Sequence, residues 1–586
     1  MNDNQMRCVD YSSSSLITDR SSLITNHSSL LLITLIGFLL RILLLDGYPF
    51  REDEAIYSYW ALHAWDVDPL FLTVWPDKPP LFLWLASLAY ILFGLTEAST
   101  RWLNIAASTL TIPITAKIAG TLTEKKHTTQ LIAALAMALN PFAISFAPTA
   151  YTDAMLVCLG MASVLMMTRR HYFWAGVWLG CAIMTKQQGV LYIPLVLGCM
   201  YVAWTSLFTR KDQDCRVDNR TYTIRASPRF LIGILFIIMP ILYWDSLRWA
   251  VAPSPWDMAQ RNYVAITLLA PDQWWSRWLV WRDLLWYLTA SSWVWGLLAI
   301  IILVIIADKI SSLSILPERE GERLNPQEFS LPLPRSRYTS LFLLWGLGYL
   351  AIHILTTIPA WDRYLLPLAP IVALLMGVIG TYLWSIKPPA LQGRATGRER
   401  VSYILSLLGR RALLLLMLVL SIQPSIQAAS GRLPIGGDHG AYDGYREAVQ
   451  WVKEQLTEDD AVQIVLYHRV LGWHHRFYFY EEIHRGDMSL RWFPHEVYLA
   501  DNAAKTPHRR RLLITPQWVP LRTLELHLQM HHLTRQEKAV FGAFTLYEIT
   551  QPMDHRCDWC LCQPKSTIFS AFIFQDGSQS DTMCKR

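Results

Sequence analysis

Long runs of hydrophobic residues alternate with short polar segments from about residue 29 to residue 428. The clearest runs, with their flanks, cover 30–45, 131–146, 230–244, 296–307, 341–358 and 412–422. A helix needs about 20 apolar residues to cross the roughly 30 Å of hydrocarbon in a bilayer. One such run could be a buried helix of a soluble protein, but a series of them predicts a polytopic membrane protein.

The positions of basic residues constrain the path of the chain, because Lys and Arg concentrate in cytoplasmic loops. The clusters Lys125-Lys126, Arg169-Arg170, Arg210-Lys211 and 387–400 should all stay inside. The segment 79–93 is short and starts with two prolines, and counting it as a crossing would place Lys125 and Lys126 outside. We therefore expect it to lie at the outer interface. About eleven crossings (11–13) remain by the run-length criterion, and they are predicted near 29–46, 100–120, 129–148, 150–168, 172–186, 188–208, 229–250, 284–306, 339–358, 363–384 and 403–425.

Four regions follow from this path. Residues 1–28 are Ser-rich and read as a disordered cytoplasmic tail, and residues 29–428 form the membrane domain, with a first outer loop over 47–99. An odd number of crossings places the rest of the chain outside. There, Tyr445–Leu456 predicts an amphipathic helix, and 462–467, 512–515 and 543–549 predict strands. We expect a mainly α fold with a small extracytoplasmic α/β domain over 429–552 and an irregular tail over 553–586.

Composition narrows the class of protein further. The chain is 53% hydrophobic and only 17% charged, and its mean hydropathy is +0.24. The net charge of +6 comes from clusters between apolar runs, so it indicates membrane topology rather than nucleic-acid binding. Cys557, Cys560 and Cys562 lie close to His555, but a single cluster lacks the paired spacing of a structural zinc site. We expect no metal site.

The segment 255–286 is crowded with tryptophan, interleaved with Arg277 and Arg282. Amphipathic aromatic residues gather at the level of the lipid headgroups, so this segment should be an interfacial loop or helix. It could serve only as a membrane anchor, or it could contact the prenyl chain of a lipid substrate.

Several charged residues on the predicted outer side are not explained by membrane insertion. They are Asp53-Glu54, Asp77-Lys78, Asp153, Lys186 and Arg363. Each has a simple structural interpretation: a loop acid pair or helix cap for Asp53-Glu54, a helix cap for Asp153, a lysine reaching the headgroups for Lys78 and Lys186, and a local pair with Asp362 for Arg363. Together they bring acids and bases to one face, as a site that binds an anion and removes a proton requires. The residues alone leave a transporter and a transferase open.

The same residues lie in motifs that resemble the GT-C glycosyltransferases. The motifs are Arg51-x-Asp53-Glu54-Ala55-x-Tyr57, Asp77-Lys78-Pro79-Pro80-Leu81 ahead of Trp84, Phe93-Gly94 with Arg101, Asn140-Pro141, Thr152-Asp153-Ala154, Thr185-Lys186 and Arg363-Tyr364-Leu365-Leu366-Pro367. The chain is most similar to the bacterial protein O-mannosyltransferase-like and aminoarabinose-transferase-like group. The resemblance covers roughly residues 30–430, and the order of the motifs is more specific than any one of them.

This resemblance implies an inverting transfer of a sugar from a polyprenyl-phosphate donor to a hydroxyl on a protein, a lipid or a glycan. It implies Asp53 as the general base with Glu54 in support and Asp153 as a second acid. Lys78, Arg363 and Lys186 are implied as ligands of the donor phosphate, and Asp77, Tyr57 and Tyr364 as substrate-binding residues. Asp77 stands where some relatives carry Glu, which makes a metal there doubtful, and we expect no cofactor.

A transporter or lipid-linked sugar flippase is the alternative function. Transporters commonly contain internal repeats and helices interrupted at the middle of the membrane. The chain shows no repetition between its halves, and its charged groups gather at one interface. We therefore favour the transferase, in the plasma (inner) membrane with the N-terminus in the cytoplasm.

Overall fold

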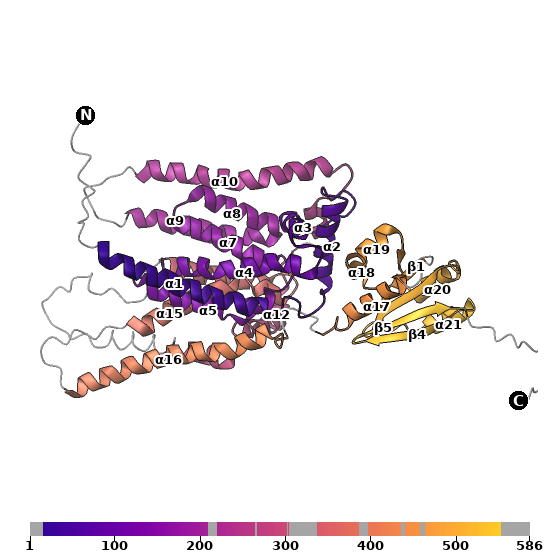
Figure 1. The fold of residues 1–586 in the computed structure, drawn as a ribbon. Coiled ribbons are helices and arrows are strands. Elements are labelled where there is room, and N and C mark those ends of the chain that lie inside the picture. Colours follow the sequence, from indigo (N-terminus) through magenta and orange to yellow (C-terminus); the bar gives the residue numbers. More distant parts are fainter. Residues whose placement is uncertain are drawn as a thin grey trace, which may run out of the picture.

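The computed structural model of the protein describes residues 16–208, 219–263, 266–301, 303, 337–385, 397–434, 440–457 and 463–551. The part up to Ala429 is helical, and the part after it contains a small sheet. In Figure 1 most of the helices run side by side in one bundle, and the sheet with its helices forms a smaller body at one end of that bundle. The predicted mainly α fold with a small C-terminal α/β part is therefore present.

The bundle contains α1 (Leu16–Ile42), α4 (Glu97–Ala119), α5 (Lys126–Ala138), α7 (Asp153–Thr168), α8 (Tyr172–Thr185), α9 (Ile193–Phe208), α10 (Asn219–Arg248), α14 (Arg337–Leu355), α15 (Leu368–Ser385) and α16 (Gly397–Ala429). Further helical segments of the same part are α2 (Glu52–Asp66), α3 (Leu81–Phe93), α6 (Pro141–Phe146), η2 (Gln187–Tyr192), α11 (Pro255–Tyr263), α12 (Pro271–Trp286) and η3 (Asp362–Leu365). A further apolar helix covers Ser292–Ile301.

Within the described residues, four helical segments are long and apolar enough to cross a membrane singly: Gln187–Thr205, Ser227–Arg248, Arg337–Leu355 and Leu408–Ala429. A fifth arises if α3 and α4 count as one span, but the two helices are bent by 119°. Such a bend suits the predicted placement of α3 at the interface. The chain is thus a multi-pass membrane protein by its apolar helices, and eleven crossings stay a prediction.

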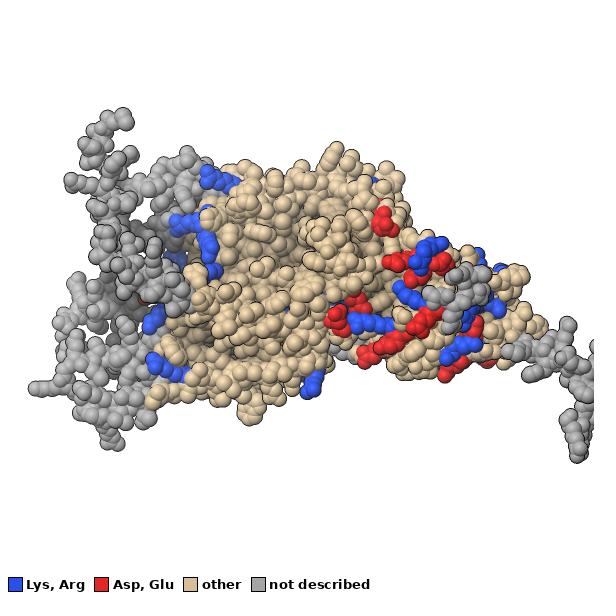
Figure 2. Space-filling view, in the orientation of Figure 1, with Lys and Arg blue, Asp and Glu red and all other residues tan. Residues whose placement is uncertain are grey.

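On the face shown in Figure 2, the charged residues lie toward the two ends of the molecule. Figure 2 shows a wide belt without charged residues over the bundle, Lys and Arg at the end away from the sheet, and residues of both signs over the C-terminal body. Two of the basic clusters predicted to be cytoplasmic, Lys125-Lys126 and Arg169-Arg170, are exposed. Arg210-Lys211 and much of 387–400 lie outside the described residues.

Small residues set the closest helix contact in the bundle. A Cβ atom on Gly176 of α8 would lie 2.1 Å from the carbonyl oxygen of Phe230, and one on Gly233 of α10 would lie 2.1 Å from that of Phe173. Because lipid gives helices no hydrophobic reason to associate, close approach of backbones at small residues is a main source of packing energy.

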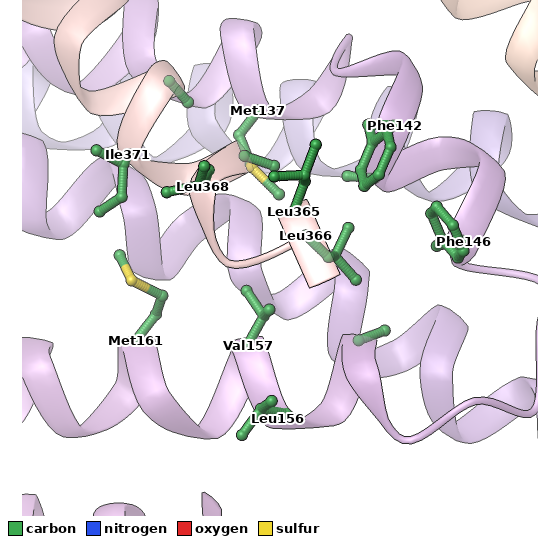
Figure 3. Packing of buried hydrophobic residues seen from close by; sticks show 14 of the residues in the cluster. Met137, Phe142, Phe146, Leu156, Val157, Met161, Leu365, Leu366, Leu368 and Ile371 are labelled. Carbon is green, nitrogen blue, oxygen red and sulfur yellow. The ribbon is translucent and has the colours of Figure 1, made fainter. Parts of the chain in front are cut away.

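An apolar core lies where α5, α6, α7 and the start of α15 meet. Figure 3 shows side chains from these elements directed toward one another: Met137, Phe142, Phe146, Leu156, Val157, Met161, Leu365, Leu366, Leu368 and Ile371. Leu365 and Leu366 directly follow Arg363 and Tyr364 in sequence. The core therefore fixes the short η3 segment that carries these two predicted site residues.

The C-terminal body holds a five-stranded sheet in the order β2-β1-β3-β5-β4. Its strands are β1 (Ile464–His468), β2 (Met488–Trp492), β3 (Arg510–Pro516), β4 (Thr534–Phe541) and β5 (Phe544–Thr550). β1 pairs in parallel with β2 and β3, and β5 pairs antiparallel with β3 and β4. Its helices are α17 (Tyr445–Thr457), α18 (Gly472–Tyr478), α19 (Tyr480–Arg485), α20 (Glu496–Ala504) and α21 (Leu524–Met530). The predicted helix and three strands correspond to α17, β1, β3 and β5.

The predicted tails fall partly outside the described residues. Helix α1 begins at Leu16 and so extends into the segment 1–28 that was expected to be a disordered tail. Residues 552–586, with Cys557, Cys560 and Cys562, lie outside the described part. Residues 255–286, expected at the interface, form α11 and α12 for most of their length.

Candidate active site

Asp53 and Arg363 form an ion pair between the first outer loop and the η3 segment. Helix α2 begins at Glu52 and places Asp53 in its first turn. The Oδ2 atom of Asp53 lies 2.5 Å from a terminal nitrogen of the Arg363 guanidinium. The neighbouring Asp362 instead accepts a hydrogen bond from the backbone N–H of Arg363, at 2.7 Å. The guanidinium therefore reaches across to Asp53, a partner that the local sequence did not indicate.

Lys78 lies beside Asp77 in the loop ahead of α3. Its Nζ is 3.1 Å from Asp77 Oδ1 and donates a hydrogen bond of 2.8 Å to the hydroxyl of Tyr263. Asp77 also accepts a hydrogen bond of 3.2 Å from the amide of Asn262. Because Lys78 is only 4% exposed, it does not extend to the headgroups. Burial lowers the pKa of Lys78, and the charge of Asp77 partly offsets this effect.

Asp153 and Lys186 form the third pair. Asp153 lies in the first turn of α7, and its Oδ1 accepts a hydrogen bond of 2.6 Å from Lys186 Nζ. Both residues are buried. Lys186 Nζ also lies 4.7 Å from the centroid of the Tyr364 ring. The carboxylate of Asp153 thus binds a cation instead of capping its helix.

The three pairs belong to one polar cluster. The charges of Asp53 and Arg363 act on Lys78, and that of Asp153 acts on Arg363. The Arg363 guanidinium lies 4.7 Å from the centroid of the Tyr151 ring. Of the predicted site residues, the structure brings together Asp53, Tyr57, Asp77, Lys78, Asp153, Lys186, Arg363 and Tyr364. Burial, and next the charge of Asp53, raise the pKa of Tyr57, so its hydroxyl stays protonated and can donate a hydrogen bond.

Glu54 has other partners and is fully buried. Its Oε2 accepts the backbone N–H of Arg51 at 3.1 Å, and its Oε1 accepts the backbone N–H of Ala150 at 2.8 Å. Arg101 Nε lies 3.3 Å from the same Oε1. Glu54 therefore ties the start of α2 to α4 and to the segment ahead of α7.

An open groove with a volume of about 720 Å³ adjoins the cluster. Its walls come from the loop ahead of Asp77, from the end of α10 and from α11: Trp75, Trp249, Val251, Ala252, Pro253, Ser254, Asp257, Met258, Arg261 and Asn262. Asn262 connects the two regions because it lines the groove and also binds Asp77.

No three His, Cys, Asp or Glu side chains in the described part of the chain are placed to hold one metal ion. Asp53, Asp77 and Asp153 are each next to a cationic side chain. Such an arrangement suits a ligand with negative charge, which would share the cations with the carboxylates.

Sequence reasoning missed several residues that complete the cluster. Tyr151 immediately precedes the Thr152-Asp153 motif, and Tyr263 and Asn262 end the helix that opens the Trp-rich segment. Gln187 follows Lys186 and donates a hydrogen bond of 2.6 Å to the backbone oxygen of Asp77. Closeness to a charged motif was the only signal for Tyr151 and Gln187, and the sequence carried none for Tyr263.

Comparison with known proteins gives a partial family match and structures of similar fold. Residues 77–244 match the family model of dolichyl-phosphate-mannose-protein mannosyltransferases. Two solved structures of ArnT from Cupriavidus metallidurans have similar folds. One is bound to undecaprenyl phosphate, with 13% identity, a TM-score of 0.55 and coverage of 90% of this chain and 98% of that chain. The apo structure has 14% identity, a TM-score of 0.55 and coverage of 91% and 98%. No curated protein sequence matched the chain.

These findings confirm the predicted resemblance. The chain is a multi-pass membrane protein with the fold of the GT-C glycosyltransferases, to which ArnT belongs. Part of the chain matches the mannosyltransferase family model, and the chain as a whole has a fold similar to that of ArnT. The segment that matches the family model contains Asp77, Lys78, Asp153 and Lys186, whereas Asp53 and Arg363 lie outside it.

Proposed function

We propose that the protein is a membrane glycosyltransferase that moves a sugar from a polyprenyl-phosphate donor to a hydroxyl acceptor on the outer face of the membrane. The observation that carries this proposal is the convergence of the three ion pairs, which come from segments far apart in the sequence. The fold shared with ArnT, which has been solved with undecaprenyl phosphate, and the mannosyltransferase family match support the choice of donor.

Asp53 is the best candidate for the general base. The acceptor hydroxyl must lose a proton as its oxygen attacks the anomeric carbon, and a carboxylate at hydrogen-bond distance can take that proton. The Asp53 side chain is 29% exposed, whereas those of Asp77 and Asp153 are 7% and 4% exposed. Of the three carboxylates, that of Asp53 is therefore the most accessible to an acceptor.

Arg363 would couple donor binding to the activation of this base. In the structure, the guanidinium of Arg363 occupies one carboxylate oxygen of Asp53. A donor phosphate offers Arg363 another anionic partner, and among the described residues the buried Nε atom of Arg363 has no hydrogen-bond acceptor. Donor binding would draw the guanidinium toward the phosphate, and Asp53 would become free to accept a proton. This order predicts that the donor binds before the acceptor.

Lys78 would stabilise the leaving group, with Lys186 as a further cation. As the bond between the sugar and the phosphate breaks, negative charge grows on the polyprenyl phosphate. A fixed cation at that point stabilises the transition state by about 3–4 kcal/mol. Asp153 would hold Lys186 in place, and Asp77, Tyr57 and Tyr364 would contact the sugar or phosphate. The acceptor oxygen attacks opposite the leaving phosphate, so the anomeric centre is inverted, and the reaction needs no metal or other cofactor.

The arrangement of charges supports an orientation. In Figure 2, Lys and Arg lie at the end of the bundle away from the sheet, as expected of a cytoplasmic face. We propose that the N-terminus is cytoplasmic, and that the site and the C-terminal body lie outside the plasma (inner) membrane. The acceptor would be a protein, a lipid or a glycan on that side.

A transfer assay tests this proposal. Purified protein is offered a panel of radiolabelled polyprenyl-phosphate sugars with a mixed membrane extract as acceptor. We expect label to leave one donor class and to appear on an acceptor. Label that stays on every donor, while the same protein moves lipid-linked sugars across a bilayer, would support the transporter instead.

A further inference from the structure

The segment 46–50, which joins α1 to α2 just ahead of Asp53, is held by the C-terminal body. The backbone N–H of Phe50 donates a hydrogen bond of 3.1 Å to the hydroxyl of Tyr478. The carbonyl oxygen of Phe50 is 2.9 Å from Nε2 of His474, which donates to it. The Phe50 ring is fully buried and packs edge-on against Phe477, at 4.9 Å between centroids. Helix α18 thus contacts the backbone N–H, the backbone carbonyl oxygen and the side chain of Phe50.

Glu97, at the start of α4, collects further contacts from the C-terminal body. Its Oε1 accepts hydrogen bonds from the hydroxyl of Tyr478 at 2.5 Å and from Arg446 Nε at 2.8 Å. Its Oε2 accepts a second hydrogen bond from Arg446 at 2.6 Å. The same arginine donates to the backbone oxygens of Asp46 and Tyr48, each at 2.9 Å. A planar guanidinium can satisfy a carboxylate and two carbonyl groups at once in a way that lysine cannot.

From Glu97 the network continues toward the candidate base. Arg101, which is fully buried, lies between Glu97 (3.2 Å) and Glu54 (3.3 Å). It also donates to the backbone oxygens of Leu45 and Tyr48, both at 3.0 Å. Glu54 fixes the first turn of α2, in which Asp53 lies. A continuous set of polar contacts, partly exposed at Arg446 and fully buried at Arg101, therefore joins α17 and α18 to the residue beside Asp53.

We propose that the C-terminal body acts as a clamp that sets the position of Asp53, with Arg446 and Tyr478 as positioning residues for sugar transfer. The inference rests on the proposed function, because it assigns a role in that reaction to a part of the chain that touches none of the reacting groups. It gives the C-terminal body a task that neither its fold nor its sequence indicated. A general base works only within hydrogen-bond distance of the proton that it removes. Greater mobility of the first turn of α2 would therefore slow sugar transfer without weakening donor binding.

The test uses the full-length purified chain in detergent, with the variants Tyr478→Phe and Arg446→Gln. Tyr467→Phe and Arg510→Gln are matched controls. The Tyr467 hydroxyl bonds Asn502, and Arg510 pairs with Glu548, both inside the C-terminal body and away from the first outer loop. Two quantities are measured: hydrogen exchange of the amides of residues 46–57, and the rate of transfer at varied donor concentrations.

We expect faster exchange over 46–57 in both clamp variants and a fall in kcat of about tenfold or more, the loss typical of a hydrogen bond to a charged group. KM for the donor should change by less than about threefold, since the cations of the site are intact. Both controls should match wild type in both measurements. The kcat of an Arg446→Lys variant should lie between those of wild type and Arg446→Gln. Lysine keeps the positive charge but lacks the planar set of N–H donors of the guanidinium.

Two results would overturn the clamp. One is unchanged exchange in Tyr478→Phe and Arg446→Gln, which would mean that the C-terminal body does not hold the loop. The other is faster exchange with unaltered kcat, which would mean that the loop's order does not matter to transfer. A wild-type protein that transfers no sugar would instead refute the proposed function, and the exchange measurement would still decide whether the clamp exists.

Discussion

Asp53 and Glu54 are neighbours in sequence, but their surroundings assign them different tasks. The side chain of Asp53 is partly exposed and faces one guanidinium, whereas Glu54 is fully buried and accepts two backbone N–H groups as well as Arg101. A buried carboxylate whose oxygens are bonded to protein groups stabilises the structure. A carboxylate that is partly exposed to solvent can exchange protons. The sequence motif contains both residues and does not distinguish them.

Replacing Glu54 should therefore reduce stability, and replacing Asp53 should not. Removing one partner of a buried ion pair costs about 3–5 kcal/mol, and Glu54→Gln also disturbs two backbone hydrogen bonds. We expect the thermal midpoint of purified Glu54→Gln to fall by several degrees, while Asp53→Asn stays close to wild type. Equal midpoints for the two variants would contradict the structural role of Glu54.

Lys78 should matter for the donor. Lys78→Ala removes a buried cation from the polar cluster, and a hydrogen bond to a charged group is worth about 1.5–3 kcal/mol. We expect the affinity for undecaprenyl phosphate to fall by about tenfold or more, measured by quenching of tryptophan fluorescence. Arg282→Ala is the control, because Arg282 is an exposed cation of α12 that pairs with Asp283. An equal loss in both variants would indicate a general charge effect instead of a phosphate site.

At the residue scale, the sequence predicted which residue types would form the site but not how they pair. Eight of the predicted residues gather in the structure. Their types could be predicted because polar groups at membrane depth are costly and therefore mark functional sites. Their partners were not predictable. Asp53 pairs with Arg363, which lies near the other end of the membrane domain in sequence, and Glu54 accepts a hydrogen bond from the backbone of Ala150. Tyr263 joined the site from a segment in which aromatic residues are so frequent that no single one stands out.

The elements of the bundle depend on close packing at glycines. Helices α8 and α10 meet where Gly176 and Gly233 leave room for the backbone of the other helix. A side chain at either position would collide with a carbonyl oxygen, which cannot move without displacing its helix. Helix α8, which makes this contact, is followed directly by Lys186 of the candidate site.

Gly176→Ala should destabilise the protein. The added methyl group would lie 2.1 Å from the carbonyl oxygen of Phe230, and overpacking of this kind costs about 1–3 kcal/mol. Gly348→Ala is the matched control, since a Cβ atom on Gly348 of α14 would have no neighbour within 4 Å. We expect a lower thermal midpoint for Gly176→Ala and a wild-type midpoint for Gly348→Ala. Indistinguishable midpoints would contradict the packing of α8 against α10.

At the element scale, the hydrophobic pattern predicted the long helices well and the C-terminal body incompletely. Continuous apolar runs lead directly to helices such as α14 and the second half of α10. The strands β2 and β4 were missed because they are the edges of the sheet, where most residues are partly or fully exposed and apolar alternation is weak. β1 and β3 are almost wholly buried, and their apolar sequences made them recognisable.

At the scale of the molecule, the face of the bundle shown in Figure 2 has a belt without charged residues between a basic end and the end next to the C-terminal body. This polarity predicts the side of the membrane on which each end lies. The contacts of α18 with Phe50 also bring the C-terminal body against the segment that leads to the candidate base.

A tag inserted after residue 440 should be accessible from outside the cell. Basic residues favour the cytoplasmic side, so the opposite end of the bundle should face outward. We expect an impermeant reagent to label the tag in intact cells, and a tag near Lys125 to be labelled only after the membrane is broken. Labelling of the 440 tag only in broken cells would invert the orientation and place the site in the cytoplasm.

The measurement that tests the central claim most directly is the single-turnover rate of sugar transfer by wild type and by Asp53→Asn, with equal amounts of folded protein and a saturating donor. General base catalysis contributes about 10²–10⁴ to a rate, so we expect transfer by Asp53→Asn to be slower by at least 100-fold, with donor affinity little changed. Transfer by Asp53→Asn within about threefold of wild type would contradict the assignment of Asp53 as the base and the mechanism built on its release from Arg363.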